Sequence, residues 1–188
     1  MTRDLEDRLR RIEDKQEIAD LVALYGFVMD ERDLVGLPTL FTDDARLGSA
    51  DGVFDAHGLA AIEEAYAGRF AVLGATNHFV HSSISRFEDD DPDRAHGLVS
   101  GHAEVVRNGE TLVVALRYHD VYQRTARGWR ISERVMSYMY YLPVDAYAAT
   151  LPTADRSLVY GEPRPADWPA VLVGGDLDWL RAHYDQAT

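Results

Sequence analysis

The sequence contains no cysteine, and this absence removes several kinds of chemistry at once. Disulfides, iron–sulfur clusters, thiolate zinc sites and cysteine nucleophiles are all excluded. The sequence also lacks any apolar run of about 18 residues, the length that a membrane-spanning helix needs. Residues 1–15 are charged throughout and lack the apolar segment of a signal peptide. We therefore expect a cytoplasmic protein with no membrane partner.

Positive charge is scarce as well. The 19 Lys and Arg residues face 32 Asp and Glu residues, which gives a net charge of −13. Such a surface repels phosphate backbones, so nucleic acid is not an expected partner. No Gly-x-Ser-x-Gly elbow, Walker loop or dinucleotide fingerprint occurs, which argues against common serine hydrolases, P-loop enzymes and Rossmann dehydrogenases. With 188 residues, 46% of them hydrophobic, one compact domain is expected.

The first 70 residues have the apolar spacing of helices. Apolar residues recur at steps of three and four over residues 3–31, which predicts a long amphipathic helix. Asp33 is placed to cap a second, short helix that runs through Leu37 to Phe41, and residues 42–44 read as a turn. A short hairpin is expected around 46–54, and a third helix over 58–70.

The period then changes to that of strands. The segments 78–87, 95–106, 111–123 and 129–141 are rich in β-branched and aromatic residues and are joined by short turn sequences. They predict an antiparallel meander with the helices on one side, an α+β fold. Residues 143–188 are proline-rich and end in a short predicted helix at 177–184. We predict one domain at 1–142 and a C-terminal extension at 143–188, packed on it through Trp168, Leu172, Trp179 and Leu180.

Five polar residues lie inside predicted elements rather than at loop tips: Tyr25, Asp30, His78, His102 and Arg134. A carboxylate beside a histidine fixes the imidazole tautomer and stabilises the imidazolium, so that the other ring nitrogen can accept a proton from carbon. A tyrosine and an arginine can donate hydrogen bonds to a departing oxygen. Together these residues are an acid–base set that needs no metal or cofactor.

Each of these residues also has a purely structural interpretation. Asp30 fits a solvated acid at a helix end, Tyr25 lies on the apolar stripe and fits a core residue, and His78 fits a buried, hydrogen-bonded histidine. Metal ligation is not expected, because His78 and His81 are three residues apart on a strand and face opposite sides. Adjacent His119 and Asp120 point apart for the same reason.

Strict alternation along residues 129–141 predicts the two faces of the last strand. It places Arg134, Met136, Tyr138 and Tyr140 on one face, and Trp129, Ile131 and Val135 on the other. A guanidinium on a covered face needs an anionic or hydrogen-bonding partner. The opposite face would expose apolar side chains, which predicts a homo-oligomer, dimer or trimer.

Three stretches of the sequence resemble a known family. They are Gln16-Glu-Ile-Ala-Asp-Leu with Tyr25, Asp30-Glu-Arg-Asp-Leu and Leu40-Phe-Thr-Asp-Asp-Ala; Thr76-Asn-His-Phe-Val; and Gly128-Trp-Arg-Ile-Ser-Glu-Arg. Over about residues 5–142 the chain resembles SnoaL-like proteins of the nuclear transport factor 2-like superfamily. The resemblance implies a cone-shaped, curved, mostly antiparallel sheet wrapped around a pocket, with three N-terminal helices.

Within that superfamily the chain is most similar to the branch of scytalone dehydratase, bile acid 7α-dehydratase and hexachlorocyclohexane dehydrochlorinase. This likeness implies a cofactor-independent lyase in which Asp30 and His78 are the catalytic pair. It assigns Tyr25 and Arg134 to the leaving group and His102 to the pocket. The scytalone enzyme's hairpin tyrosine falls near Ser49 here, so the likeness does not extend to that residue.

The resulting hypothesis is a dehydratase-like lyase acting on a small hydrophobic or aromatic ring compound. His78, oriented by Asp30, would remove a proton from carbon while a hydroxyl or a halide leaves. Apolar and aromatic residues expected near the substrate are Phe27, Val80, Met136, Tyr138 and Tyr140. An isomerase or polyketide cyclase using the same base and a non-catalytic ligand-binding module are the alternatives.

Overall fold

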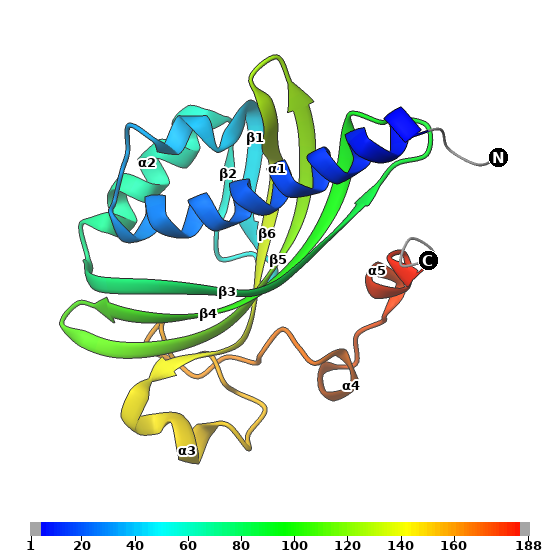
Figure 1. The fold of residues 1–188 in the computed structure, drawn as a ribbon. Helices are drawn as coiled ribbons and strands as arrows, with labels where there is room; N and C mark the ends of the chain where they lie inside the picture. Colours follow the sequence, from blue (N-terminus) through cyan, green and yellow to red (C-terminus); the bar gives the residue numbers. More distant parts are fainter. Residues whose placement is uncertain (1–4, 185–188) are drawn as a thin grey trace.

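The computed structural model describes residues 5–184. The elements are α1 (Leu5–Asp30), the 3₁₀ helix η1 (Leu37–Thr39), β1 (Phe41–Ser49), β2 (Asp55–His57), α2 (Leu59–Phe70), β3 (Leu73–Phe87), β4 (Arg94–Arg107), β5 (Glu110–Thr125), β6 (Gly128–Pro143), η2 (Val144–Ala146), α3 (Tyr147–Thr150), α4 (Ala170–Val173) and α5 (Asp178–Arg181). Figure 1 shows one curved sheet with α1 and α2 on one side and the C-terminal segments on the other.

The six strands form a single sheet in the order β2-β1-β6-β5-β4-β3. Every neighbouring pair is antiparallel except β1 and β6, which are parallel. The α+β class and the antiparallel meander of four long strands are therefore confirmed. Apart from the end of β3, which is at Phe87 as predicted, the strands extend one to five residues beyond their predicted bounds, because hydrogen-bonded pairing continues there.

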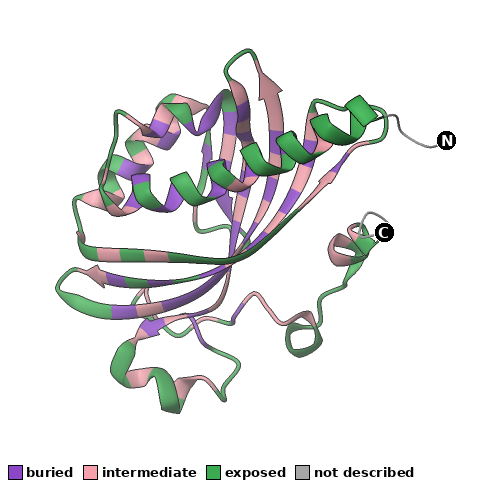
Figure 2. Ribbon diagram, viewed as in Figure 1, coloured by how far each residue is buried: buried purple, intermediate pink, exposed green. Residues whose placement is uncertain are grey.

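The long first helix is confirmed, and its apolar stripe forms the core against the sheet. Ile18, Val22, Tyr25 and Met29 are buried at three- and four-residue steps, while the opposite side of α1 faces solvent (Figure 2). The buried Asp14 accepts hydrogen bonds from Arg124 Nη2 and from Trp129 Nε1 on the sheet. These contacts hold the N-terminal half of α1 on β5 and β6.

The segment after α1 differs from the sequence prediction in two places. The second helix is only one 3₁₀ turn, and its N-cap is Gly36 rather than Asp33. Asp33 Oδ1 instead accepts hydrogen bonds from the Val35 and Gly36 backbone N–H groups, at 3.0 and 2.9 Å, in the turn before the helix. Residues 42–44, predicted as a turn, lie within β1, because Phe41 and Arg46 are both paired with β6. The predicted hairpin exists as β1 and β2.

The two faces predicted for β6 are wrong at its start, because a β-bulge interrupts the alternation. Tyr122 pairs with Ile131 whereas Val121 pairs with Glu133, so Ser132 is the extra residue and its hydroxyl donates to Val121 O. Trp129 and Ile131 consequently face the core on the same side as Arg134 and are 2% and 0% exposed. They do not form an exposed apolar face. The prediction of a homo-oligomer rests on that face and is therefore not supported by these residues.

The C-terminal segment contacts the outer face of the sheet. The buried Arg156 donates hydrogen bonds to the carbonyls of Met139, Thr153 and Trp168. The Arg117 guanidinium lies 3.8 Å from the Trp168 ring centroid, and the His119 ring packs against Trp179. Leu172, predicted to be buried, is 67% exposed. Trp168 and Trp179 make the sheet contacts on either side of α4, so Leu172 between them does not need to pack.

A pair of glycine substitutions tests the packing of β3 on β4. A Cβ on Gly101 would lie 2.6 Å from the Phe79 carbonyl oxygen, so Gly101→Ala forces the strands to shift and should lower the free energy of unfolding by about 1–3 kcal/mol. Gly68 on α2 has open space around its Cβ position, and Gly68→Ala should instead raise it by roughly 0.5–1 kcal/mol. Urea denaturation of both variants measures the two changes in the free energy of unfolding. Destabilisation of both variants, or of neither, would contradict this packing of β3 on β4.

Candidate active site

A cavity of about 280 Å³ lies between α1, α2 and the sheet face beneath them. For scale, an apolar cavity of about 150 Å³ can hold benzene. Six tyrosines line this cavity: Tyr25, Tyr66, Tyr118, Tyr138, Tyr141 and Tyr160. Its other polar lining residues are Thr76, His78, Arg69 and Arg107, and the remainder are apolar. Its chemistry is therefore that of a hydrophobic site with a few convergent polar groups.

Asp30 and His78 meet at one side of this cavity. Asp30 Oδ1 lies 2.6 Å from His78 Nδ1, and Asp30 Oδ2 accepts a hydrogen bond from the His78 backbone N–H at 2.8 Å. That backbone group is available because β3 is an edge strand of the sheet. The carboxylate thus holds both the ring and the backbone of His78. An Nδ1–H donated to Asp30 leaves Nε2 as the acceptor nitrogen of the imidazole.

Asp30 remains ionised at neutral pH. Burial raises its pKa, but hydrogen bonds from the His78 ring and backbone, together with the His78 charge, outweigh burial, so the pKa of Asp30 lies below its usual value. A carboxylate with a lowered pKa can stabilise the imidazolium that forms when His78 accepts a proton.

The helix geometry explains how Tyr25 and Asp30 serve one site. Five residues of helix turn the chain by about 500°, so the two side chains project roughly 140° apart. Tyr25 lines the cavity, whereas Asp30 does not and instead approaches His78 from the end of α1. The carboxylate therefore acts on His78 from behind, while the imidazole and the tyrosine face the cavity.

Tyr25 belongs to a buried cluster of tyrosines. Its hydroxyl is hydrogen-bonded to that of Tyr66 on α2, and its ring packs edge-on against those of Tyr66 and Tyr118. Burial raises the pKa of Tyr66 and of Tyr118 well above the usual value. These phenols stay protonated at neutral pH, and in a hydroxyl pair one proton remains available for a third group.

Arg134 is fully buried but does not line the cavity. Its Nε and Nη2 donate to Asp120 Oδ1 and Oδ2 at 2.8 and 2.6 Å, and Asp120 Oδ2 also accepts from Tyr122. The guanidinium carbon lies 4.1 Å from the ring centroids of both Tyr25 and Tyr118. Arg134 is therefore placed to orient these tyrosines rather than to contact a departing group.

The structure divides the residues expected around the substrate. Met136 and Tyr138 line the cavity. Phe27 is 69% exposed, because it lies about 200° around α1 from Tyr25. Tyr140 is on the opposite face of the sheet, since a second bulge in β6 near Met139 separates it from Tyr138.

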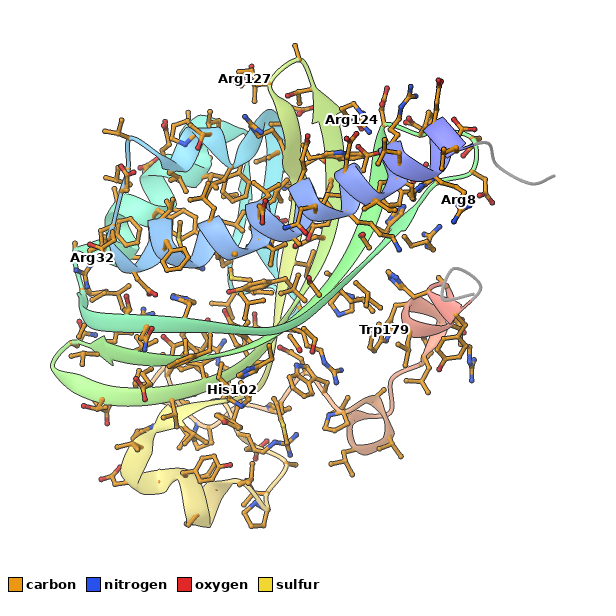
Figure 3. The ribbon with its side chains drawn as sticks, in the orientation of Figure 1. Arg8, Arg32, His102, Arg124, Arg127 and Trp179 are labelled. Atoms are coloured by element: carbon orange, nitrogen blue, oxygen red, sulfur yellow. The ribbon has the colours of Figure 1, made fainter. Side chains whose placement is uncertain are left out.

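His102 and Val80 also lie outside the main cavity. Both border a narrow hollow of about 10 Å³ beside it, which Tyr25 and His78 also line. His102 Nδ1 is 2.6 Å from His81 Nε2, and its ring packs near Tyr140 on the side of the C-terminal segment (Figure 3). Burial and the charge of His81 lower the pKa of His102. The expected pocket histidine thus contacts another histidine on the outer face.

Sequence reasoning missed seven polar cavity residues and Asp120, the partner of Arg134. The cavity residues are Tyr66, Arg69, Thr76, Arg107, Tyr118, Tyr141 and Tyr160. A signal was present for Arg69, since it follows Ile62 and Tyr66 at helical steps and so continues an apolar stripe. Asp120 and Tyr118 are two residues apart on β5 and therefore share a face.

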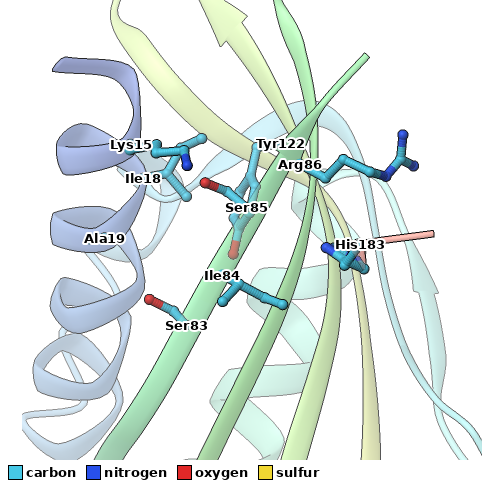
Figure 4. A pocket seen from close by; sticks show the side chains of 9 residues that line it. All are labelled: Lys15, Ile18, Ala19, Ser83, Ile84, Ser85, Arg86, Tyr122 and His183. Atoms are coloured by element: carbon cyan, nitrogen blue, oxygen red, sulfur yellow. The ribbon is translucent and has the colours of Figure 1, made fainter. Parts of the chain in front are cut away.

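A second hollow, of about 230 Å³, lies between α1 and β3 near the chain's C-terminal end (Figure 4). Lys15, Ser83, Arg86 and His183 are among its lining residues, and no carboxylate lines it. It therefore offers no acid–base pair of the kind formed by Asp30 and His78. Within residues 5–184, no three His, Asp or Glu side chains gather as a metal site, and no helix is long and apolar enough to cross a membrane.

Comparisons with solved structures identify the fold. A protein from Novosphingobium aromaticivorans, provisionally described as an aromatic ring hydroxylase, matches 71% of this chain and 94% of its own, with 25% identity and a TM-score of 0.65. A provisional scytalone dehydratase from the same organism matches 74% and 91%, with 17% identity and a TM-score of 0.64. Hexachlorocyclohexane dehydrochlorinase LinA-type3 from Novosphingobium barchaimii matches 75% and 94%, with 19% identity and a TM-score of 0.62.

The family is defined by sequence as well. No curated protein matches the chain. The family model for the SnoaL-like domain matches residues 10–135, and the fold is that of the nuclear transport factor 2-like superfamily. The chain belongs to the SnoaL-like domain family.

Proposed function

We propose that this protein is a cofactor-independent lyase that removes water from a small ring-containing molecule. The observation that carries the proposal is the 2.6 Å contact between Asp30 Oδ1 and His78 Nδ1 at the wall of a tyrosine-rich cavity. Fold neighbours named as a scytalone dehydratase and a dehydrochlorinase support a role in converting small molecules.

In the proposed reaction, His78 Nε2 accepts a proton from a carbon atom of the substrate. The electrons of that C–H bond form a carbon–carbon double bond as the neighbouring C–O bond breaks. The departing hydroxyl takes a proton from the Tyr25–Tyr66 hydroxyl pair and leaves as water. Asp30 stabilises the imidazolium during this step, and the proton then returns from His78 to the tyrosines through solvent.

An isomerase or cyclase would use the same base without expelling a group. The Tyr25–Tyr66 pair favours elimination, because it supplies a neutral proton donor that lines the same cavity as His78. A binding module would have no need for a carboxylate that contacts both the ring and the backbone N–H of the same histidine.

Product mass tests the proposal directly. The protein is incubated with a panel of one- and two-ring β-hydroxy ketones and β-hydroxy acids, and products are followed by mass spectrometry. We expect a product lighter by one water, formed by the native protein and not by His78→Gln. Conversion at unchanged mass would instead establish an isomerase or cyclase, and binding of these compounds without conversion would establish a binding module.

A further inference from the structure

Two arginines line the cavity without a carboxylate partner. Arg69 comes from α2 and Arg107 from the end of β4, and neither forms a salt bridge with any carboxylate of residues 5–184. No Asp or Glu lines the cavity. In a chain with a net charge of −13, this is an unusual concentration of unpaired positive charge. Arg69 and Arg107 are both half-buried, and guanidinium groups withdrawn from water are normally paired, so a cavity lined by two of them fits an anionic ligand.

The surroundings of Arg69 hold it in place without neutralising it. Its guanidinium carbon lies 4.1 Å from the Phe54 ring centroid and 5.5 Å from that of Tyr66. Burial lowers its pKa, but the nearby tyrosines, Tyr66 first among them, raise it above the usual guanidinium value. Arg69 is therefore charged at all relevant pH values and is fixed by rings rather than by an acid.

Arg107 and two tyrosines complete the same end of the cavity. The charges of Arg69 and Arg107 both oppose the rise that burial causes in the pKa of Tyr141 and of Tyr160. Asp51 also acts on Tyr160, but its Oδ1 accepts hydrogen bonds from Ser49 and Val53, and it does not line the cavity. The end of the cavity thus combines two guanidinium groups with two phenol donors.

This arginine end is separate from the catalytic pair. On β4, Arg107 lies four residues from Ala103, which pairs with His78, a separation of about 13 Å along the strand. Tyr160 comes from the C-terminal segment, beyond the 10–135 region that the family model matches. The cavity therefore has two ends. The end with Asp30 and His78 lies within the region that the family model matches, whereas the cationic end includes Tyr160 from the C-terminal segment.

We infer that the substrate carries an anionic group, a carboxylate or a phosphate, which binds Arg69 and Arg107 while its ring reaches His78. This inference rests on the proposed function and specifies the substrate class. A cavity of about 280 Å³ is roughly twice the size that holds benzene, which favours one or two rings with a short acidic substituent. Planar guanidinium groups suit both anions, since each can accept paired hydrogen bonds.

Binding of inert probes tests the inference independently of turnover. Calorimetry compares 1-naphthoate and 1-naphthyl phosphate with the neutral, similarly shaped 1-naphthamide. We expect at least one anion to bind about tenfold or more tightly than the amide, as one charge-assisted hydrogen bond would give. In Arg69→Gln and in Arg107→Gln, the ratio of the Kd of the amide to the Kd of the anion should fall towards one. Arg69→Lys, which keeps the charge, should retain part of the preference.

Arg127→Gln is the matched control, because it removes the same charge from the exposed β5–β6 turn, away from the cavity (Figure 3). It should keep the full preference. Equal binding of anions and amide by the native protein would overturn the inference, as would a preference unchanged in both cavity variants. Calorimetry and the product-mass assay keep the two proposals distinguishable. Loss of water from a neutral substrate, with no anion preference in binding, would refute the inference alone. An anion preference without loss of water from any compound tested would refute only the proposed lyase.

Discussion

Replacing Asp120 with asparagine is expected to lower the free energy of unfolding by about 3–5 kcal/mol, the usual effect of breaking a buried ion pair. Asp120 and Arg134 have fully buried side chains, and two hydrogen bonds join them. The asparagine side chain is neutral and has only one oxygen, so the guanidinium would keep its charge in a fully buried site with a weaker partner. Urea denaturation followed by circular dichroism measures the loss.

A double-mutant cycle separates the pair from its surroundings. Arg134→Met should also destabilise, because it leaves the Asp120 carboxylate with Tyr122 as its hydrogen-bond donor. For the cycle, Asp120→Leu is also measured alone. Asp120→Leu combined with Arg134→Met removes both charges and should be more stable than Asp120→Leu or Arg134→Met alone. Half-exposed Arg46, paired with Asp55 and Glu133, offers a comparison: Arg46→Met should change stability by no more than about 1 kcal/mol. Additive losses at Asp120 and Arg134 would show that the two residues do not act as a pair.

The sequence contained enough information for the elements of this fold but not for the faces of its strands. The helical stripe from Ile18 to Met29 and the β-branched strands were readable, because both follow simple periods. The bulge at Ser132 was not readable, since it depends on pairing with Val121 across β5. One extra residue moved Trp129 and Ile131 from a supposed outer face into the core.

The candidate site divides in a similar way. Resemblance to a family singled out Asp30 and His78, which lie 48 positions apart and which the structure brings into contact. Arg134 was singled out as well, but its buried partner Asp120 could not be identified without the pairing of β5 with β6. Arg69 and Arg107 escaped notice because charged residues on a helix and at a strand end are usually solvated. Their place in a cavity follows only from how α2 packs over the sheet.

The proposed chemistry predicts the largest effects for the catalytic pair. Once a substrate is identified, His78→Gln should lower kcat by about 10²–10⁴-fold, the usual contribution of a positioned general base. Glutamine has no nitrogen that accepts a proton at neutral pH. Asp30→Asn should also lower kcat by about 10²-fold or more, since a neutral amide cannot stabilise the imidazolium. Steady-state kinetics with purified variants measures both effects.

Controls are available on the same elements. His81→Gln lies three residues along β3, where His81 faces away and contacts His102, and Asp20→Asn lies on the exposed side of α1. Both should keep nearly native kcat. Full turnover by a folded His78→Gln protein, or equal losses in His81→Gln, would remove the basis for His78 as the base.

The pH dependence and the double variant test whether Asp30 acts through His78. Because the folded-state pKa of Asp30 is lowered, its carboxylate contributes stability above the ordinary aspartate pKa, and this contribution is lost as pH falls through the lowered value. Acidification from pH 7 to pH 5 therefore leaves Asp30 ionised, and any loss of kcat in that range has to come from another group.

Two residues that act as one unit give non-additive losses, so Asp30→Asn combined with His78→Gln should be no slower than His78→Gln alone. A double variant slower by the product of both single effects would mean that Asp30 acts on the substrate directly and not through the imidazole. The 2.6 Å contact with Nδ1, and the absence of Asp30 from the cavity lining, favour the non-additive result.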